Sequence, residues 1–148
     1  MRIVTWNVNG IRAAIRKGFD KFVEKIDADI WMLQEVRCLP EQLPPKWAPP
    51  TGSEMILHPA EKKGYSGVST ISRVEMKEIG RGMKGSLDPE DSEGRVLVTQ
   101  HGEITLVNTY LPSGSSKEER QRYKEDWMAQ WRDFIKPMFN SDKPVIVA

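Results

Sequence analysis

Apolar and polar residues follow two different periods near the start of the chain, and each period predicts a kind of element. Residues 2–7 and 30–33 are rich in β-branched and apolar side chains on both alternating sets, which is typical of strands buried on two faces. Between these runs, four apolar residues are spaced like one face of a helix: Phe19, Phe22, Val23 and Ile26. A connection of this length allows a helical crossover, so the pattern predicts a parallel βαβ unit.

The rest of the chain predicts further strands and one long helix. Strands are expected at 55–58, 68–72, 75–79, 95–100, 103–109 and 145–147, with a loop at 80–93 and a tight turn at His101-Gly102. Six residues trace one face of the helix: Tyr123, Trp127, Trp131, Phe134, Ile135 and Met138. Ser116 and Glu119 form a capping box before it. Strands mixed with crossover helices predict an α/β layered fold class.

Composition narrows the class of protein further. The chain has 148 residues, 39% of them hydrophobic and 29% charged, which suits one soluble domain. Its single cysteine, Cys38, excludes an internal disulfide framework and a cysteine-rich zinc site. The net charge of +1 excludes a histone-like polycation but permits a local basic face. No apolar run approaches ~20 residues, so no membrane span is expected.

The C-terminal residues carry an expectation of their own. The run Pro144–Ala148 is apolar and strand-like, with no turn or polar tail after it. Chain termini usually lie at surfaces, so we expect a fragment, with residues 1–148 forming an incomplete domain. A half-domain would expose the apolar face of its sheet, and self-association of the chain is a further expectation.

Three polar residues follow predicted strands and are the first candidates for chemistry. Asn7, Glu35 and Tyr110 each stand at the carboxyl end of a strand, where open α/β sheets gather ligands. A carboxylate beside a neutral amide suits Mg²⁺, which takes one or two protein carboxylates and keeps waters or phosphates. Two plainer interpretations stay open: Glu35 as a strand-end charge paired with Arg37, and Asn7 as a turn-forming amide.

A loop and several arginines are weaker candidates for binding. Tyr65 lies in the Gly64–Gly67 loop after Lys62 and Lys63, where an aromatic ring and lysines could contact a sugar-phosphate backbone. Alternatively, Tyr65 covers a sheet edge. Residues 60–86 hold six Lys or Arg against three Glu, a modest basic bias. A lone arginine is usually a solvated surface charge, so Arg12, Arg37 and Arg95 are each weak evidence for a binding site. Structural roles are expected for three other reactive residues: His58, His101 and Cys38.

Five motifs appear in order along the chain: Trp6-Asn7-Val8-Asn9-Gly10-Ile11-Arg12, Leu33-Gln34-Glu35-Val36-Arg37, Gly64-Tyr65-Ser66-Gly67-Val68, Glu93-Gly94-Arg95-Val96 and Asn108-Thr109-Tyr110-Leu111-Pro112. Together they resemble the exonuclease III/AP endonuclease branch of the endonuclease/exonuclease/phosphatase superfamily over the whole chain. The Leu-Gln-Glu run alone would also fit DNase I-like enzymes and phosphoinositide phosphatases of the wider superfamily.

The resemblance implies a four-layered αββα sandwich and a base excision repair enzyme. Such an enzyme incises double-stranded DNA at abasic sites, or trims 3′ ends, with Mg²⁺ or Mn²⁺. Asn9 stands where eukaryotic relatives often have Asp, so the bacterial pattern is closer and a cytoplasmic, nucleoid-associated location is implied.

Roles for individual residues follow from the same resemblance. Glu35 would bind the metal ion, and Asn7 would help to form the metal site. Tyr110 would contact the scissile phosphate region. Five residues would be DNA-facing or structural near the site: Arg12, Arg37, Tyr65, Arg95 and Ser113. Ser113 stands where family members often have Asn or Gln, which puts that contact in doubt.

The family continues after the strand at 145–147 with Gly-Asp-x-Asn and a later Asp and His, which this chain does not contain. Two hypotheses follow. The chain is the N-terminal part of a metal-dependent nuclease that is active when complete, or it is a non-catalytic half-domain that binds DNA weakly at most. A lipid or inositol phosphatase of the same superfamily is a less favoured third.

Overall fold

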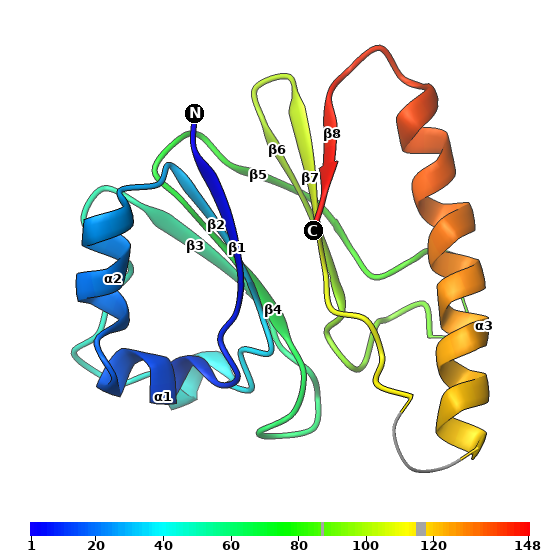
Figure 1. Cartoon of the computed structure of the whole chain (residues 1–148), viewed down its shortest axis with the longest axis horizontal. Helices are drawn as coiled ribbons and strands as arrows, with labels where there is room; N and C mark the ends of the chain where they lie inside the picture. The colour runs from blue at the N-terminus through cyan, green and yellow to red at the C-terminus, as the bar shows by residue number, and fades with distance from the viewer. Residues whose placement is uncertain (87, 115–117) are drawn as a thin grey trace.

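Two four-stranded sheets lie face to face in the computed structural model, and helices cover both outer faces (Figure 1). The structure describes residues 1–86, 88–114 and 118–148. The first sheet has the strand order β1-β2-β4-β3 and the second the order β5-β6-β7-β8. The resulting layers are helix, sheet, sheet and helix, which confirms the α/β class and the αββα sandwich.

The first sheet begins with a parallel pair and ends with antiparallel ones. Its strands are β1 (Ile3–Asn7), β2 (Ile30–Gln34), β3 (Glu54–His58) and β4 (Val68–Ser72). The helices α1 (Ile11–Arg16) and α2 (Phe19–Ile26) join β1 to β2, and a 3₁₀ turn, η1 (Pro40–Gln42), lies before β3. The predicted βαβ unit is therefore present.

The second sheet begins with antiparallel pairs and ends with a parallel one, the reverse of the first sheet. Its strands are β5 (Lys77–Arg81), β6 (Val96–His101), β7 (Ile104–Thr109) and β8 (Val145–Val147). The long helix α3 (Glu118–Ile135) and the 3₁₀ helix η2 (Lys136–Asn140) join β7 to its parallel neighbour β8. The capping box expected at Ser116 lies outside the described residues.

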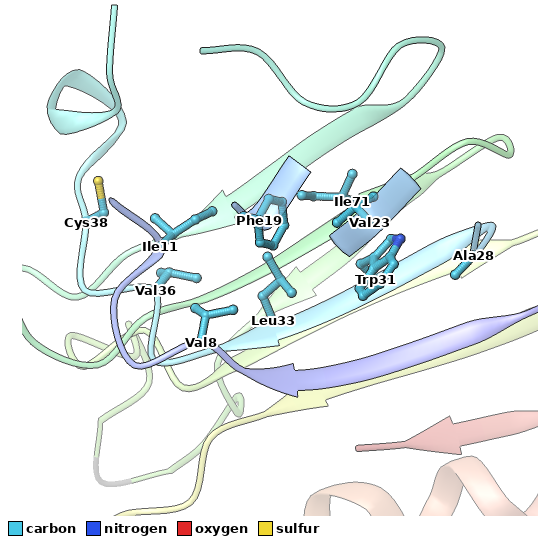
Figure 2. Packing of buried hydrophobic residues seen from close by; sticks show 10 residues of the cluster. All are labelled: Val8, Ile11, Phe19, Val23, Ala28, Trp31, Leu33, Val36, Cys38 and Ile71. Atoms are coloured by element: carbon cyan, nitrogen blue, oxygen red, sulfur yellow. The ribbon is translucent and has the colours of Figure 1, made fainter. Parts of the chain in front are cut away.

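Three apolar layers separate the elements. Ten buried residues pack between the first sheet and its helices, with Trp31 and Leu33 of β2 beneath Phe19 and Val23 of α2 (Figure 2). The alternate β2 residues Ile30 and Met32 point the other way and meet Leu106 between the sheets. A third cluster joins the second sheet to Trp127 of α3. Both faces of β2 are covered, so every residue of this strand is buried, as the sequence predicts.

The expectation that residues 2–7 are buried on both faces is wrong. β1 is the edge strand of its sheet, and Thr5 and Asn7 are exposed. The loop expected to begin at Gly80 is also shifted, because β5 runs to Arg81 with an irregularity between Glu78 and Gly80. Among the described residues, no helix is both long and apolar enough to cross a membrane.

Candidate metal and phosphate site

The carboxylate of Glu35 is the centre of the candidate site and has a partner on each side. Its Oε1 accepts hydrogen bonds from the Tyr110 hydroxyl and, at 3.2 Å, from Asn7 Nδ2. Its Oε2 pairs with Arg37 Nη2 at 2.7 Å. The structure therefore brings together the three residues that the sequence places at strand ends, and Tyr110 reaches Glu35 from the other sheet.

The parallel pairing of β1 and β2 continues into the loops and sets this geometry. Val8 N–H donates to the Gln34 carbonyl oxygen at 3.0 Å, and Gly10 N–H donates to that of Glu35 at 2.7 Å. Gly10 has a φ of 100° and Glu35 one of 53°. A left-handed backbone costs a residue with a side chain of order 1–2 kcal/mol, and such conformations cluster at functional sites. The bend at Glu35 directs its carboxylate toward Tyr110.

The donor set at Glu35 fits a hard divalent ion with few protein ligands. The described residues contain no group of three or more His, Cys, Asp or Glu side chains able to hold a metal ion. One carboxylate with open coordination positions is the arrangement that Mg²⁺ uses when waters and substrate phosphates complete its shell. Asn7 directs its amide nitrogen at Glu35, while its Oδ1 accepts from Asn9 N–H at 3.0 Å. As arranged, Asn7 orients the carboxylate, and direct ligation would require its amide to turn over.

Partner groups shift the pKa values of Glu35 and Tyr110 in opposite directions. Partial burial acts to raise the pKa of Glu35, but hydrogen bonds from Tyr110 and Asn7 and the charge of Arg37 bring it below 4.5. Burial, and then the Glu35 carboxylate, raise the pKa of Tyr110 to about 12. At neutral pH the pair is thus a carboxylate facing a fully protonated phenol, which can donate a hydrogen bond.

The buried side chain of Arg95 contacts both tyrosines near the site, Tyr65 and Tyr110. Its side chain is only 1% exposed, and its Nε donates to Glu93 at 2.7 Å. The same guanidinium donates to the Tyr110 carbonyl oxygen at 2.9 Å and to the Tyr65 hydroxyl at 3.0 Å. Of the two roles expected for Arg95, contact with DNA or a structural role, this burial favours the structural one. Its planar fork joins three residues in a single geometry.

The sequence interpretation missed Glu93 as an organising residue. Tyr65 donates to Glu93 at 3.0 Å and Tyr123 at 3.2 Å, while Arg120 of α3 pairs with it at 3.1 Å. Burial opposes a low pKa for Glu93, but Arg95 and Arg120 bring it below 4.5. Glu93 stands in the Glu-Gly-Arg motif, which is the one sequence signal that could have identified it. Tyr123 packs on the core face of α3, as expected, and its hydroxyl also reaches this cluster.

A buried pair supports the segment that carries Glu93 and Arg95. His58 Nε2 lies 2.9 Å from Asp91 Oδ2, and both residues are buried. The same oxygen accepts from the backbone N–H groups of Arg95 and Val96, each at 2.7 Å. The structural role expected for His58 agrees with this placement.

The remaining candidates lie around the site rather than within it. Arg37 is exposed apart from its contact with Glu35, and Arg12 is half-buried in α1. Tyr65 is also half-buried, its ring 5.4 Å from Lys62 Nζ and its hydroxyl directed inward to Glu93. Ser113 is exposed in the loop after β7.

Comparison with known proteins gives the family. The sequence pattern of the Endonuclease/Exonuclease/phosphatase family matches residues 4–148, so the chain belongs to that family. Among curated proteins, it is 30% identical over 148 residues to the DNA-(apurinic or apyrimidinic site) endonuclease of Dictyostelium discoideum, covering 99% of this chain and 40% of the relative. It is 31% identical over 148 residues to the exodeoxyribonuclease of Bacillus subtilis, covering 99% of this chain and 56% of that protein.

Solved structures share the fold of this chain. A 3′-5′ exonuclease from Neisseria meningitidis superposes with a TM-score of 0.86 at 24% identity, covering 99% of this chain and 56% of that one. The catalytic domain of Xenopus laevis APE2 gives a TM-score of 0.82 at 27% identity, covering 99% of this chain and 57% of that one. The chain thus spans roughly half the length of the relatives that it matches.

Proposed function

We propose that the chain supplies the metal-binding half of a Mg²⁺-dependent DNA-repair phosphodiester hydrolase of the exonuclease III/AP endonuclease type. The carrying observation is the Glu35 carboxylate, held at a strand end by Asn7, Arg37 and a protonated Tyr110. Its proposed substrate is double-stranded DNA with abasic sites or 3′ ends. The names of the relatives support this substrate, as does a related Neisseria structure described as bound to a product DNA hairpin.

Each residue of the site has a proposed part in this chemistry. Glu35 would hold the ion, which supplies Lewis-acid polarisation of a phosphate oxygen when bound. Asn7 keeps the carboxylate oriented, and Arg37 balances its charge. The Tyr110 hydroxyl would donate a hydrogen bond to charge that develops on the phosphate. Arg12, Arg37, Tyr65 and Ser113 are proposed to face the DNA, while Arg95 positions Tyr65 and Tyr110 from behind.

The proposal includes a requirement for further residues. Hydrolysis needs a group that activates or orients water, and we assign none of the described residues around Glu35 to that task. We therefore propose that catalysis requires a C-terminal portion such as the one that the relatives possess. The alternative is a non-catalytic half-domain that binds DNA weakly, which the coverage of 40–56% of the curated relatives also permits.

A complementation assay separates these functions. The 148-residue chain would be tested alone, and also joined to the part of the Bacillus subtilis exodeoxyribonuclease that follows the matched segment, on a duplex with one abasic site. We expect Mg²⁺-dependent incision only by the joined protein, and none when it carries Glu35→Gln. Incision by the chain alone would refute the need for a second half. Equal incision by the Glu35→Gln protein would refute the metal role.

A further inference from the structure

The two sheets are joined behind the site by a pair of buried amides. Gln34 on β2 donates from Nε2 to Asn108 Oδ1 on β7 at 2.7 Å. Gln34 is 7% exposed and Asn108 is 0% exposed. The proposed function assigns no role to this pair.

Each amide is also anchored within the first sheet. Asn108 Nδ2 donates to the Ser69 carbonyl oxygen at 2.8 Å and weakly to that of Leu33 at 3.3 Å. Leu33 and Ser69 are register partners in the β2–β4 pairing, so Asn108 contacts two strands of the opposite sheet at one level. Gln34 Nε2 also contacts Thr5 Oγ1 at 3.1 Å. The pair therefore fixes one strand of the second sheet against three strands of the first.

The position of the pair along the strands connects it to the site. Gln34 immediately precedes Glu35, and Asn108 lies two residues before Tyr110. Further along the strands an apolar cluster of Ile30, Met32 and Leu106 lies between the sheets. Apolar packing is non-directional and leaves small sliding movements inexpensive, whereas a hydrogen-bonded amide pair has one preferred geometry.

We infer that Gln34 and Asn108 are positioning residues whose amide pair fixes the two sheets so that the Tyr110 hydroxyl meets the Glu35 carboxylate. Buried polar pairs of this kind add little net stability when both partners are present, since a hydrogen bond to water is given up for each one formed. Their effect is on geometry: without the pair, the sandwich still forms but the carboxylate and the phenol no longer hold one separation. This inference rests on the proposed function where it concerns metal binding.

The chain offers a matched control for a purely structural effect. Ser72 Oγ and His101 Nδ1 also join the two sheets, at 3.3 Å, and both residues are buried. In the β2–β4 register Ser72 is opposite Ile30, whereas Val68 is opposite Gln34. The control contact therefore lies four residues, or about 13 Å along the strands, from the amide pair.

The experiment uses the full 148-residue chain with ¹³C-labelled tyrosine, which gives three signals, from Tyr65, Tyr110 and Tyr123. The double variant Gln34→Met/Asn108→Leu replaces both amides by apolar groups of similar size, so neither member of the pair is left buried without its partner. We expect its Tyr110 signal to move toward that of a phenol in water, and its dissociation constant for Mn²⁺ to rise about tenfold. Ser72→Ala should lower stability and change neither reading.

An unchanged Tyr110 signal in the double variant would overturn the inference, and so would an equal shift in Ser72→Ala. Should the double variant fail to fold, Gln34→Met alone removes the amide pair but keeps the Asn108 bond to the Ser69 carbonyl oxygen, so we expect a smaller shift of the Tyr110 signal in the same direction. If the wild-type chain shows no Mn²⁺ binding at Glu35, the proposed function fails, while the Tyr110 signal still decides the positioning role.

Discussion

The Tyr110 hydroxyl of the second sheet donates a hydrogen bond to the Glu35 carboxylate of the first. This contact crosses the interface between the sheets at the carboxyl ends of β2 and β7, two strands that are far apart in sequence. It gives Glu35 a second fixed donor beside Asn7. A carboxylate held in this way is preorganised, so that little ordering remains to be done when a cation or a phosphate binds.

Replacement of Tyr110 by phenylalanine tests the strength of this contact. The variant keeps the ring and removes one donor to a charged group, so we expect a loss of about 1.5–3 kcal/mol in the free energy of unfolding. The pKa of Glu35 should rise, because the hydrogen bond that lowers it most is gone. Carboxylate NMR titration measures the pKa and urea unfolding the stability. Tyr123→Phe is the control, since Tyr123 bonds Glu93 and should leave the pKa of Glu35 unchanged.

Stability should fall at high pH because of two tyrosines. Burial and nearby carboxylates raise the pKa values of Tyr110 and Tyr123 to about 12, from an ordinary 10.0. The folded state holds these protons more tightly than the unfolded state, so the stabilisation is fully present below pH 10 and is lost as pH rises toward 12. Urea unfolding at a series of pH values measures the loss. A wild-type profile that is flat over this window would contradict the phenol–carboxylate contacts.

Acid should weaken the fold for the opposite reason. Hydrogen bonds from Tyr110 and Asn7, together with Arg37, bring the pKa of Glu35 below 4.5 despite partial burial, and Arg95 and Arg120 do the same for Glu93. Their contribution is present above pH 4.5 and disappears as pH falls through the lowered values. Unfolding measured below pH 5 should show a smaller decline in Glu93→Gln than in the wild type, once the variant's own loss of stability is subtracted. An identical decline would show that Glu93 is not held by its arginines.

Gly94 should tolerate no side chain, because of a close approach between two loops. A Cβ at this position would lie 2.6 Å from the Pro59 carbonyl carbon and 2.8 Å from Ala60 N. We expect Gly94→Ala to cost about 3 kcal/mol through overpacking against backbone that cannot move aside. Gly102 has the same φ of 59° with nothing within 4 Å, so Gly102→Ala isolates the conformational strain, of about 1 kcal/mol. Urea unfolding measures the loss in free energy of unfolding of each variant. An equal loss in Gly94→Ala and Gly102→Ala would exclude a steric clash at Gly94.

The sequence predicts the architecture well wherever the pattern is periodic. The spacing of Phe19, Val23 and Ile26 and the apolar run of β2 locate α2 and its strand within a residue. The prediction fails at β5, whose Lys-Glu-Ile-Gly-Arg sequence alternates poorly and lies mostly exposed at the edge of a sheet. It also fails for the burial of β1, because which strand lies at an edge depends on strand order, which the local pattern does not contain.

The site was predicted for residues that follow strands and missed for those that approach from elsewhere. Asn7 and Glu35 could be placed because the ends of neighbouring parallel strands meet at one edge of a sheet, while Tyr110 follows a strand of the other sheet. Arg95 looked like a candidate for contact with DNA, yet Glu93 and Tyr65 enclose it. Arg120 and Tyr123 reach Glu93 from α3, 27 and 30 residues further along the chain. Nothing local in the sequence links a helix face to a distant carboxylate.

The most direct test of the account is Mn²⁺ binding at Glu35. Titration of the chain with Mn²⁺, followed by paramagnetic broadening of the Tyr110 ring signal, should show saturable binding. Glu35→Gln preserves the size of the side chain and removes its charge, so broadening should disappear. Glu24→Gln, on an exposed position of α2, should bind like the wild type. Broadening of the Tyr110 signal that persists in Glu35→Gln, or that never occurs in the wild type, would contradict the assignment of Glu35 as the metal ligand.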